Sequence, residues 1–158
     1  MPPSEAALSA ASESARATTS QEARYRITAP NSLPRSVRIV ALDARSDGIV
    51  AELVPLPWGN ARFFRSPQVG TAKFAAAIDG ADLLVMIATA GADAGAATTV
   101  GPACRRLRVT TTAVMVVDPR VAQPALAATL AQLRPYAGTL VTTSSAGFIA
   151  DMLTALRA

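Results

Sequence analysis

Residues 81–117 constrain the fold of this chain more than any other stretch. An apolar run at 82–89 is followed by a turn of small residues, a segment with helical spacing and a second apolar run at 110–117. Apolar runs of this length are typical of strands that are buried on both faces of a parallel sheet. The stretch therefore predicts a strand–helix–strand unit, and the turn after its first strand is where open α/β sheets bind ligands.

The rest of the chain continues this alternation of strands and helices. Val37 begins a further apolar run, and turn-forming residues separate the later runs. In chain order we expect strands at 37–42, 49–53, 82–89, 110–117 and 138–143, with a turn at 43–48 and a loop at 55–69. We expect helices at 71–79 and 98–107, one with Pro124 near its first turn, and a last one capped by Ser144 or Ser145.

Helical spacing also predicts which side chains face the core. In the helix at 98–107 the expected inner residues are Val100, Cys104 and Leu107. In the last helix they are Phe148, Met152, Leu153 and Leu156. Because apolar strands alternate with amphipathic helices, the pattern predicts an α/β fold, a Rossmann-like three-layer sandwich with a mostly parallel sheet of about five strands.

The chain divides by composition into two parts. Residues 1–33 are rich in Ala, Ser, Thr, Glu and Arg and have few large apolar side chains. Such a segment buries too little surface to offset its conformational entropy, so we expect a disordered or partly helical tail. Residues 34–158 form the expected single Rossmann-like domain.

The residue types that are absent exclude several classes of chemistry. The chain has no His, which removes Ser-His and Cys-His nucleophilic pairs and most zinc sites. Its single cysteine, Cys104, excludes an internal disulfide, and a reducing cytoplasm is the simplest setting. No apolar run reaches the roughly 18 residues that a membrane span needs. An enzyme is therefore the less favoured class, and we expect no catalytic residues and no metal site.

The turn after residue 89 contains the candidate ligand-binding residues Gly91, Asp93, Gly95, Thr98 and Thr99. Small residues allow backbone amides to approach an anion, and the two threonines open the next helix at its positive end. A phosphate group could bind there without a catalytic side chain. The carboxylate of Asp93 opposes this hypothesis because it repels phosphate, and tight strand-to-helix packing requires the same small residues.

The expected loop at 55–69 contains three of the chain's aromatic residues, Trp58, Phe63 and Phe64. One interpretation is that these rings cover one end of the core. The other is that they form an interaction site for a partner or a ligand. The sequence leaves both open.

Nearly all the basic residues are arginine, so acidic partners are one interpretation of the net charge of +4. The charge is scattered along the chain, however, and the other interpretation is that a modest positive charge only maintains solubility. One cluster, Arg105, Arg106 and Arg108, lies at the end of a predicted helix, where the helix dipole favours cations. There is no basic stripe interleaved with aromatic residues, so nucleic acid is an unlikely partner.

Residues 80–102, GADLLVMIATAGADAGAATTVGP, resemble the glycine-rich signature region of the FtsZ/tubulin family, in which a GADMV-type strand leads into a TAGMGGGTGTGAAP-type loop. The spacing from residue 89 to Pro102 matches without a gap, and weaker similarity extends over about 110 residues in all. The resemblance implies a GTPase-like α/β core that binds GTP or another nucleotide.

The same resemblance shows departures from the family pattern. The family's first strand and GGGGN nucleotide loop have no counterpart before Val37, and only Gly95 and Thr98 remain of the GGGTGTG signature. Residues with a Cβ restrict the backbone and block close approach of a phosphate. The resemblance thus implies a reduced, non-hydrolysing relative, in which a phosphate role carries over only to Gly91, Gly95, Thr98 and Thr99.

Two functional hypotheses follow. The first is a non-catalytic FtsZ/tubulin-like binding or assembly module, which self-associates as a homo-oligomer or docks on a larger complex. The second is a small nucleotide- or phosphate-binding enzyme or sensor that uses the turn at 91–99. In that case Asp43, Asp93 or Asp118 would hold a divalent metal, because carboxylates are the only hard ligands expected at the strand ends.

Overall fold

The computed structural model describes residues 33–158. Its centre is a sheet of five parallel strands in the order β2-β1-β3-β4-β5. The strands are β1 (Val37–Ala41), β2 (Ala61–Phe64), β3 (Leu83–Thr89), β4 (Thr110–Val116) and β5 (Thr139–Thr143). The predicted α/β class with a mostly parallel sheet is confirmed. The predicted tail lies, apart from Leu33, outside the described residues.

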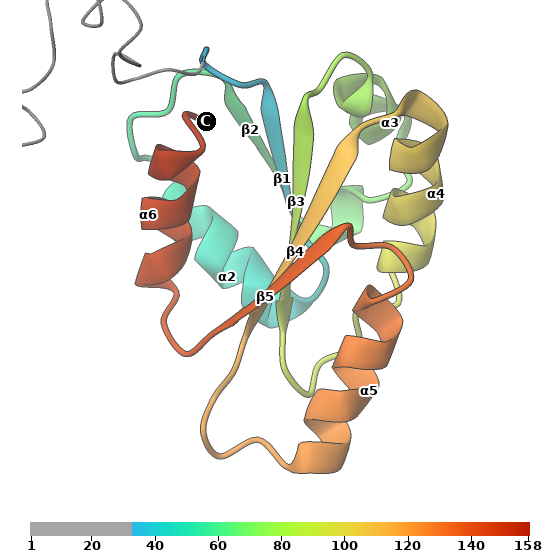
Figure 1. Ribbon diagram of the computed structural model, residues 1–158, viewed down its shortest axis with the longest axis vertical. Helices are drawn as coiled ribbons and strands as arrows, with labels where there is room; N and C mark the ends of the chain where they lie inside the picture. Colours follow the sequence, from blue (N-terminus) through green and yellow to red (C-terminus); the bar gives the residue numbers. More distant parts are fainter. Residues whose placement is uncertain (1–32) are drawn as a thin grey trace, which may run out of the picture. The chain divides into compact units, whose positions relative to one another are not determined.

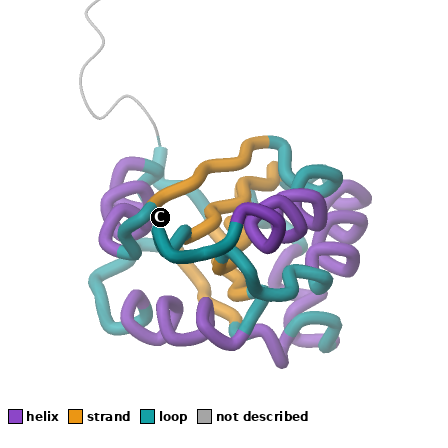
Figure 2. Tube along the Cα trace, turned by 90° about the horizontal axis from the view of Figure 1, so that it is seen from below, coloured by secondary structure: helices purple, strands orange, loops and turns teal. Residues whose placement is uncertain are grey.

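Helices cover both faces of the sheet and complete the three layers (Figures 1 and 2). One face carries α3 (Ala72–Ile78), α4 (Ala97–Leu107) and α5 (Gln123–Leu133), and the other carries α2 (Ala44–Leu53) and α6 (Gly147–Ala155). A short 3-10 helix, η3 (Ser66–Gln68), follows β2. Among residues 33–158, no helix combines the length and apolar character that crossing a membrane would require.

The central strands contribute side chains to two separate cores. In β3, Leu84 and Met86 pack beneath α3, α4 and α5, whereas Val85 and Ile87 pack beneath α2 and α6. All seven residues of β3 are buried, and so are all five of β1. Burial on both faces explains why these strands have continuous apolar runs and no alternation.

The strand order reverses between β1 and β3, and we call the region at the carboxyl ends of these two strands the crevice. The helix that follows β1 lies on one face and the helix that follows β3 lies on the other, so the connections diverge at the carboxyl ends of these neighbouring strands. Doubly wound sheets bind their ligands at such a point. The topology thus places Asp43 and the turn after Thr89 beside the crevice.

The predicted strand at 49–53 is wrong, because this segment belongs to α2. The preceding Asp43 accepts hydrogen bonds from the backbone of Arg45 and Ser46, which starts a helix where the sequence pattern indicated a turn. Ser46, Val50 and Leu53 then form the buried face at helical spacing. The N-cap formed by Asp43 therefore explains why residues 49–53 belong to a helix and not to a strand.

The predicted loop at 55–69 is also wrong in part. It contains β2 and η3, and Phe63 and Phe64 lie on the strand. A strand of only four residues, near prolines and a glycine, gives little periodic signal in the sequence. Its parallel pairing with β1 is what makes this segment a strand.

Two details of the predicted helices differ as well. The N-cap of α6 is Ala146, without a side-chain hydrogen bond, so neither Ser144 nor Ser145 caps it. Phe148 is 41% exposed and Leu107 is 36% exposed, and neither belongs to the buried core. Ile149 and Leu153 are the fully buried residues of α6, since the helix begins later and its inner face is rotated relative to the prediction.

Candidate functional site

The crevice between β1 and β3 contains a buried polar cluster centred on Asp43. Its Oδ2 accepts hydrogen bonds from Thr89 N at 2.8 Å and Ser46 Oγ at 2.7 Å. Its Oδ1 accepts from Ser46 N at 2.9 Å and Arg45 N at 3.0 Å. The carboxylate thus holds the amides at the N-terminus of α2, where helices commonly bind anions. The negative charge of Asp43 would repel a second anion at this helix end.

The turn after β3 is attached to α5 by Thr129. Gly91 N donates to Thr129 Oγ1 at 3.0 Å, and the same hydroxyl donates to Ala92 O at 2.9 Å. Gly91 has a φ of +85°, and a Cβ there would lie 3.0 Å from a methyl group of Val121. Glycine is therefore required at this position both for the backbone conformation and for the close approach of α5.

Asp93 and Gln132 hold the middle of the same turn. Gln132 accepts a hydrogen bond from Ala94 N at 2.7 Å and donates one to Asp93 Oδ1 at 2.7 Å. Asp93 Oδ1 also accepts from Gly95 N at 2.9 Å. The turn therefore uses four of its amides, those of Gly91, Ala92, Ala94 and Gly95, for bonds within the protein.

Thr98 and Thr99 lie in the first turn of α4 and are both exposed. Their amides donate to Gly95 O and Ala96 O, each at 3.0 Å, and the Thr98 hydroxyl donates to Gly95 O at 2.8 Å. The fold thus brings the five candidate residues into one turn. A phosphate bound there would have to compete with the internal hydrogen bonds, and nucleotide binding at this turn stays a prediction.

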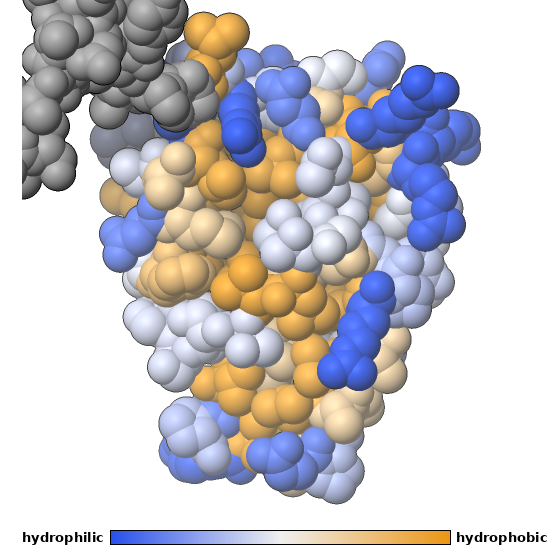
Figure 3. Space-filling view, in the orientation of Figure 1, coloured by the Kyte–Doolittle hydropathy of each residue, from blue (hydrophilic) through white to orange (hydrophobic). Residues whose placement is uncertain are grey.

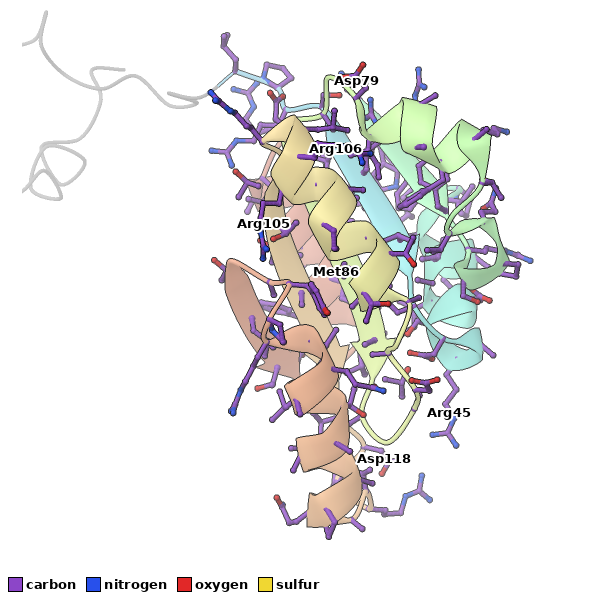
Figure 4. The ribbon with its side chains drawn as sticks, turned by 90° about the vertical axis from the view of Figure 1, so that its right-hand side faces the viewer. Arg45, Asp79, Met86, Arg105, Arg106 and Asp118 are labelled. Atoms are coloured by element: carbon purple, nitrogen blue, oxygen red, sulfur yellow. The ribbon has the colours of Figure 1, made fainter. Side chains whose placement is uncertain are left out.

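A hollow of about 580 Å³ opens at the carboxyl ends of β3 and β4. Its polar walls are Arg45, Thr89, Asp118, Arg120 and Ser144, and a smaller adjoining hollow of about 180 Å³ shares the two arginines and Asp118. Figure 4 shows Arg45 and Asp118 at this end of the sheet, whereas Asp79 and Arg106 lie at the other. The sequence reasoning named Asp118 but missed both arginines. Each arginine lies four residues after the end of a strand, β1 or β4, and this position was the available signal.

The charges of this hollow are partly paired. Arg120 Nη2 lies 2.8 Å from Asp118 Oδ2, and both side chains are well exposed. Side-chain and backbone hydrogen bonds from Arg120 lower the pKa of Asp118 to about 2, with a smaller contribution from the charge of Arg45. The hollow therefore carries a net positive charge at neutral pH.

The structure does not bring together Asp43, Asp93 and Asp118, the carboxylates considered for a metal. In residues 33–158, no three residues of the types His, Cys, Asp and Glu are grouped so that they could hold a metal ion. Asp43 and Asp93 accept hydrogen bonds within their own turns, and Asp118 pairs with Arg120.

The three aromatic residues of the sequence prediction separate into two environments. Phe64 is 4% exposed and packs edge-to-face on Phe74 of α3, with ring centroids 5.1 Å apart. Trp58 and Phe63 are half-buried on the opposite face, 6.0 Å apart, and the Trp58 indole donates to Leu53 O at 2.7 Å. Phe64 thus belongs to the core, while Trp58 and Phe63 reach the surface.

A hollow of about 460 Å³ lies against β2, and we call it the β2 groove. It is lined by Val54, Leu56, Trp58, Ala61, Arg62, Phe63, Phe64, Gln68 and Lys73. Val54 and Leu56 are 54% and 41% exposed, which makes them two of the most exposed large apolar residues in the described part of the chain. Apolar side chains exposed together, beside half-buried aromatic rings, are a common feature of interaction sites.

No protein-family model matches this chain, and no curated protein matches its sequence. The likeness of residues 80–102 to the FtsZ/tubulin signature therefore stays a hypothesis.

Proposed function

We propose that this protein is a non-catalytic binding module that docks a protein partner through the β2 groove. The observation that carries this proposal is the groove itself, where exposed Val54 and Leu56 lie beside Trp58 and Phe63 at the edge of the sheet. Aromatic anchors beside exposed apolar side chains are typical of the centre of protein–protein contacts. In this proposal, the FtsZ/tubulin-like signature belongs to a reduced relative that keeps the α/β core as a scaffold.

The crevice supports a binding role more than a catalytic one. The helix end after β1 already carries the carboxylate of Asp43, and the amides of Gly91, Ala94 and Gly95 are bonded within the protein. The chain has no His to act as a general base. Interactions that stabilise the fold thus occupy the groups that would otherwise bind and activate a phosphate.

Site-specific photo-crosslinking tests the docking proposal. Leu56 is replaced by benzoylphenylalanine in the full chain, in the cells that naturally produce it, with the same replacement at exposed Arg106 of α4 as the control. We expect an adduct of defined mass with one protein, either a second copy or another chain, from position 56 only. Equal adducts from both positions, or none from position 56, would contradict the proposal.

One observation favours the alternative, a nucleotide- or phosphate-binding enzyme or sensor. The walls of the hollow of about 580 Å³ include Thr89, which precedes the turn, and Arg45 and Arg120, whose guanidinium groups suit phosphate. Calorimetric titration with GTP and ATP, with and without magnesium, tests it. Heat that Arg45→Gln abolishes would support this alternative, and the absence of heat in every titration would exclude it.

A further inference from the structure

The strand β2 has a partner on only one side within the described residues. It pairs with β1, and no other strand of residues 33–158 lies beyond it in the sheet. An edge strand presents backbone N–H and C=O groups to any extended chain that reaches it. Natural sheets usually protect such edges, and β2 is short and carries Arg62, features that oppose pairing with another copy. Two hollows, of about 460 and 270 Å³, nevertheless flank β2.

The two faces of β2 differ in chemistry. Ala61 and Phe63 face the side of α2 and α6, where Trp58 and the exposed Leu56 continue the apolar surface. Phe64 packs on the side of α3, and Arg62 faces the same side because side chains alternate along a strand. An incoming strand would therefore meet apolar groups on one face and charge on the other.

The charge on the α3 side is positive, and no ion pair within the described residues balances it. Arg62 stands directly opposite Arg38 in the parallel register, and Lys73 of α3 lines both hollows with Arg62. In the described part of the chain, none of these three cations forms an ion pair with a carboxylate. Like charges opposite each other on neighbouring strands are destabilising, so this arrangement favours an anionic group from outside.

The environment of Arg38 reinforces this point. Its side chain is buried, 6% exposed, and its Nε donates to Ala77 O at 2.6 Å. Burial, and then the charge of Arg62, lower the pKa of the Arg38 guanidinium, while Asp82 acts in the opposite direction. A carboxylate placed beside Arg62 would relieve repulsion that extends into the core.

We propose that the β2 edge accepts an extended segment of a partner protein as an added strand, in which acidic side chains alternate with apolar ones. This inference rests on the proposed function and names the chemistry of the partner. The acidic side chains would face Arg62 and Lys73, and the apolar ones would face Phe63 and Leu56. Backbone pairing supplies affinity in strand addition, and the alternating side chains supply specificity.

Two other occupants fit the edge less well. A second copy of this chain that pairs β2 with β2 would bring two Arg62 side chains near each other, which adds repulsion where charge is already uncompensated. A nucleic acid would meet Arg62 and Lys73 but has no peptide backbone to pair with the strand. The indole of Trp58 is also held in place by its hydrogen bond to Leu53 O and its tilted contact with Phe63.

Fluorescence anisotropy with the full chain tests the proposal. The probe is a labelled peptide of about eight residues, a common strand length, in which valine and glutamate alternate. The comparison probes are a peptide with lysine in place of glutamate, a peptide of the same composition with its glutamates in one block, and a labelled oligothymidylate. We expect binding of the alternating acidic peptide alone.

Charge reversal then locates the site. Arg62→Glu and Lys73→Glu each alter an exposed residue, and we expect each to weaken the alternating acidic peptide by about tenfold, since attraction becomes repulsion. Arg106→Glu makes the same change on α4 and should leave binding unaltered. Ala61→Pro, which blocks pairing at the edge, should also weaken binding, and thermal melting confirms that each variant folds.

The outcomes separate this inference from the proposed function. Crosslinks from position 56 without any binding of the alternating peptide overturn the strand inference and leave the docking proposal standing. Equal binding of the blocked peptide, or equal loss in Arg106→Glu, also overturns it, because the charge would then act without strand pairing. Oligothymidylate binding that Arg62→Glu abolishes, without peptide binding, overturns it in favour of nucleic acid.

Discussion

The side chain of Asp43 both caps α2 and links the end of β1 to the end of β3. Its two oxygens accept four hydrogen bonds, three from α2 and one from the end of β3. A neutral or apolar residue at this position leaves buried donors without partners, which costs more than the hydrogen bonds contribute. The residue that the sequence suggested as a metal ligand thus acts as a cap and a crosslink between β1 and β3.

We predict that Asp43→Ala lowers the free energy of unfolding by about 1–3 kcal/mol, because it removes a helix cap and leaves Thr89 N unpaired. Asp43→Asn should lose less, since an amide oxygen still accepts from the helix backbone. Urea unfolding followed by circular dichroism measures both variants. Unchanged stability of Asp43→Ala would show that the bonds to Ser46 and Thr89 contribute little.

The ion pair of Asp118 and Arg120 predicts a specific titration. Hydrogen bonds from Arg120 hold the pKa of Asp118 at about 2. Because the folded-state pKa is depressed, the pair stabilises the fold above the unfolded value of about 4, and that contribution is lost as the pH falls from about 4 to about 2.

Carbon NMR of the side-chain carboxyl groups measures this titration. We expect the signal of Asp118 to titrate near pH 2 in the native chain. Arg120→Gln should move its pKa up toward the ordinary aspartate range, whereas Arg106→Gln should leave it unaltered. A native pKa in the ordinary range would contradict the hydrogen bonds between these two side chains.

Among the elements, most strands and helices were predictable from the sequence, whereas α2 and β2 were not. The strands at β3 and β4 and the helices α3 and α4 follow from apolar runs and helical spacing, within a residue or two of their ends. The segment at 49–53 was misassigned because Ile49 and Val50 favour strands, while the decisive cap, Asp43, lies six residues earlier. β2 depends on pairing with β1, which a local pattern does not reveal.

Of the candidate sites, too, only a part could be predicted from the sequence. The turn containing Gly91 and Gly95 could be located, because it follows a predicted strand. Its connection to α5 could not, since Thr129 and Gln132 are about forty residues away and no local motif links them to the turn. The pairing of Arg62 with Arg38 likewise requires the strand register.

Two glycines within helices allow a matched prediction at the scale of the element. A Cβ at Gly101 of α4 would lie 2.6 Å from Tyr136 Cβ, so α4 and the segment after α5 approach each other closely there. A Cβ at Gly48 of α2 would meet nothing within 4 Å. The same substitution should therefore have opposite effects in the two helices.

We predict that Gly101→Ala destabilises the protein by about 1–3 kcal/mol through overpacking. Gly48→Ala should stabilise it by about 0.5–1 kcal/mol, because glycine in a helix interior costs conformational entropy. Chemical unfolding of both variants under identical conditions gives the comparison. If both substitutions changed the free energy of unfolding equally and in the same direction, the close packing of Gly101 against Tyr136 would have no effect on stability.

At the scale of the whole sheet, the two edge strands differ in charge. β2 carries Arg62 and lies beside Lys73, whereas β5 consists of threonines, Leu140 and Val141 without a charged residue. Figure 3 shows apolar side chains gathered over β5 on this face. Edges without charge or proline are prone to pair with another copy, so we predict that any self-association uses β5 and not β2.

If copies associate through β5, the net charge of the chain should make this association dependent on salt. Copies that each carry +4 repel one another, and salt screens this repulsion over distances beyond about 8–10 Å. We therefore predict that light scattering detects larger species as ionic strength rises at fixed protein concentration. Thr142→Lys places a charge on the exposed β5 edge and should keep the protein monomeric at high salt, whereas Arg106→Lys should not. If Thr142→Lys left the association intact and Arg62→Glu altered it, the copies would associate through β2. This result would contradict the prediction that β5 is the edge that self-associates.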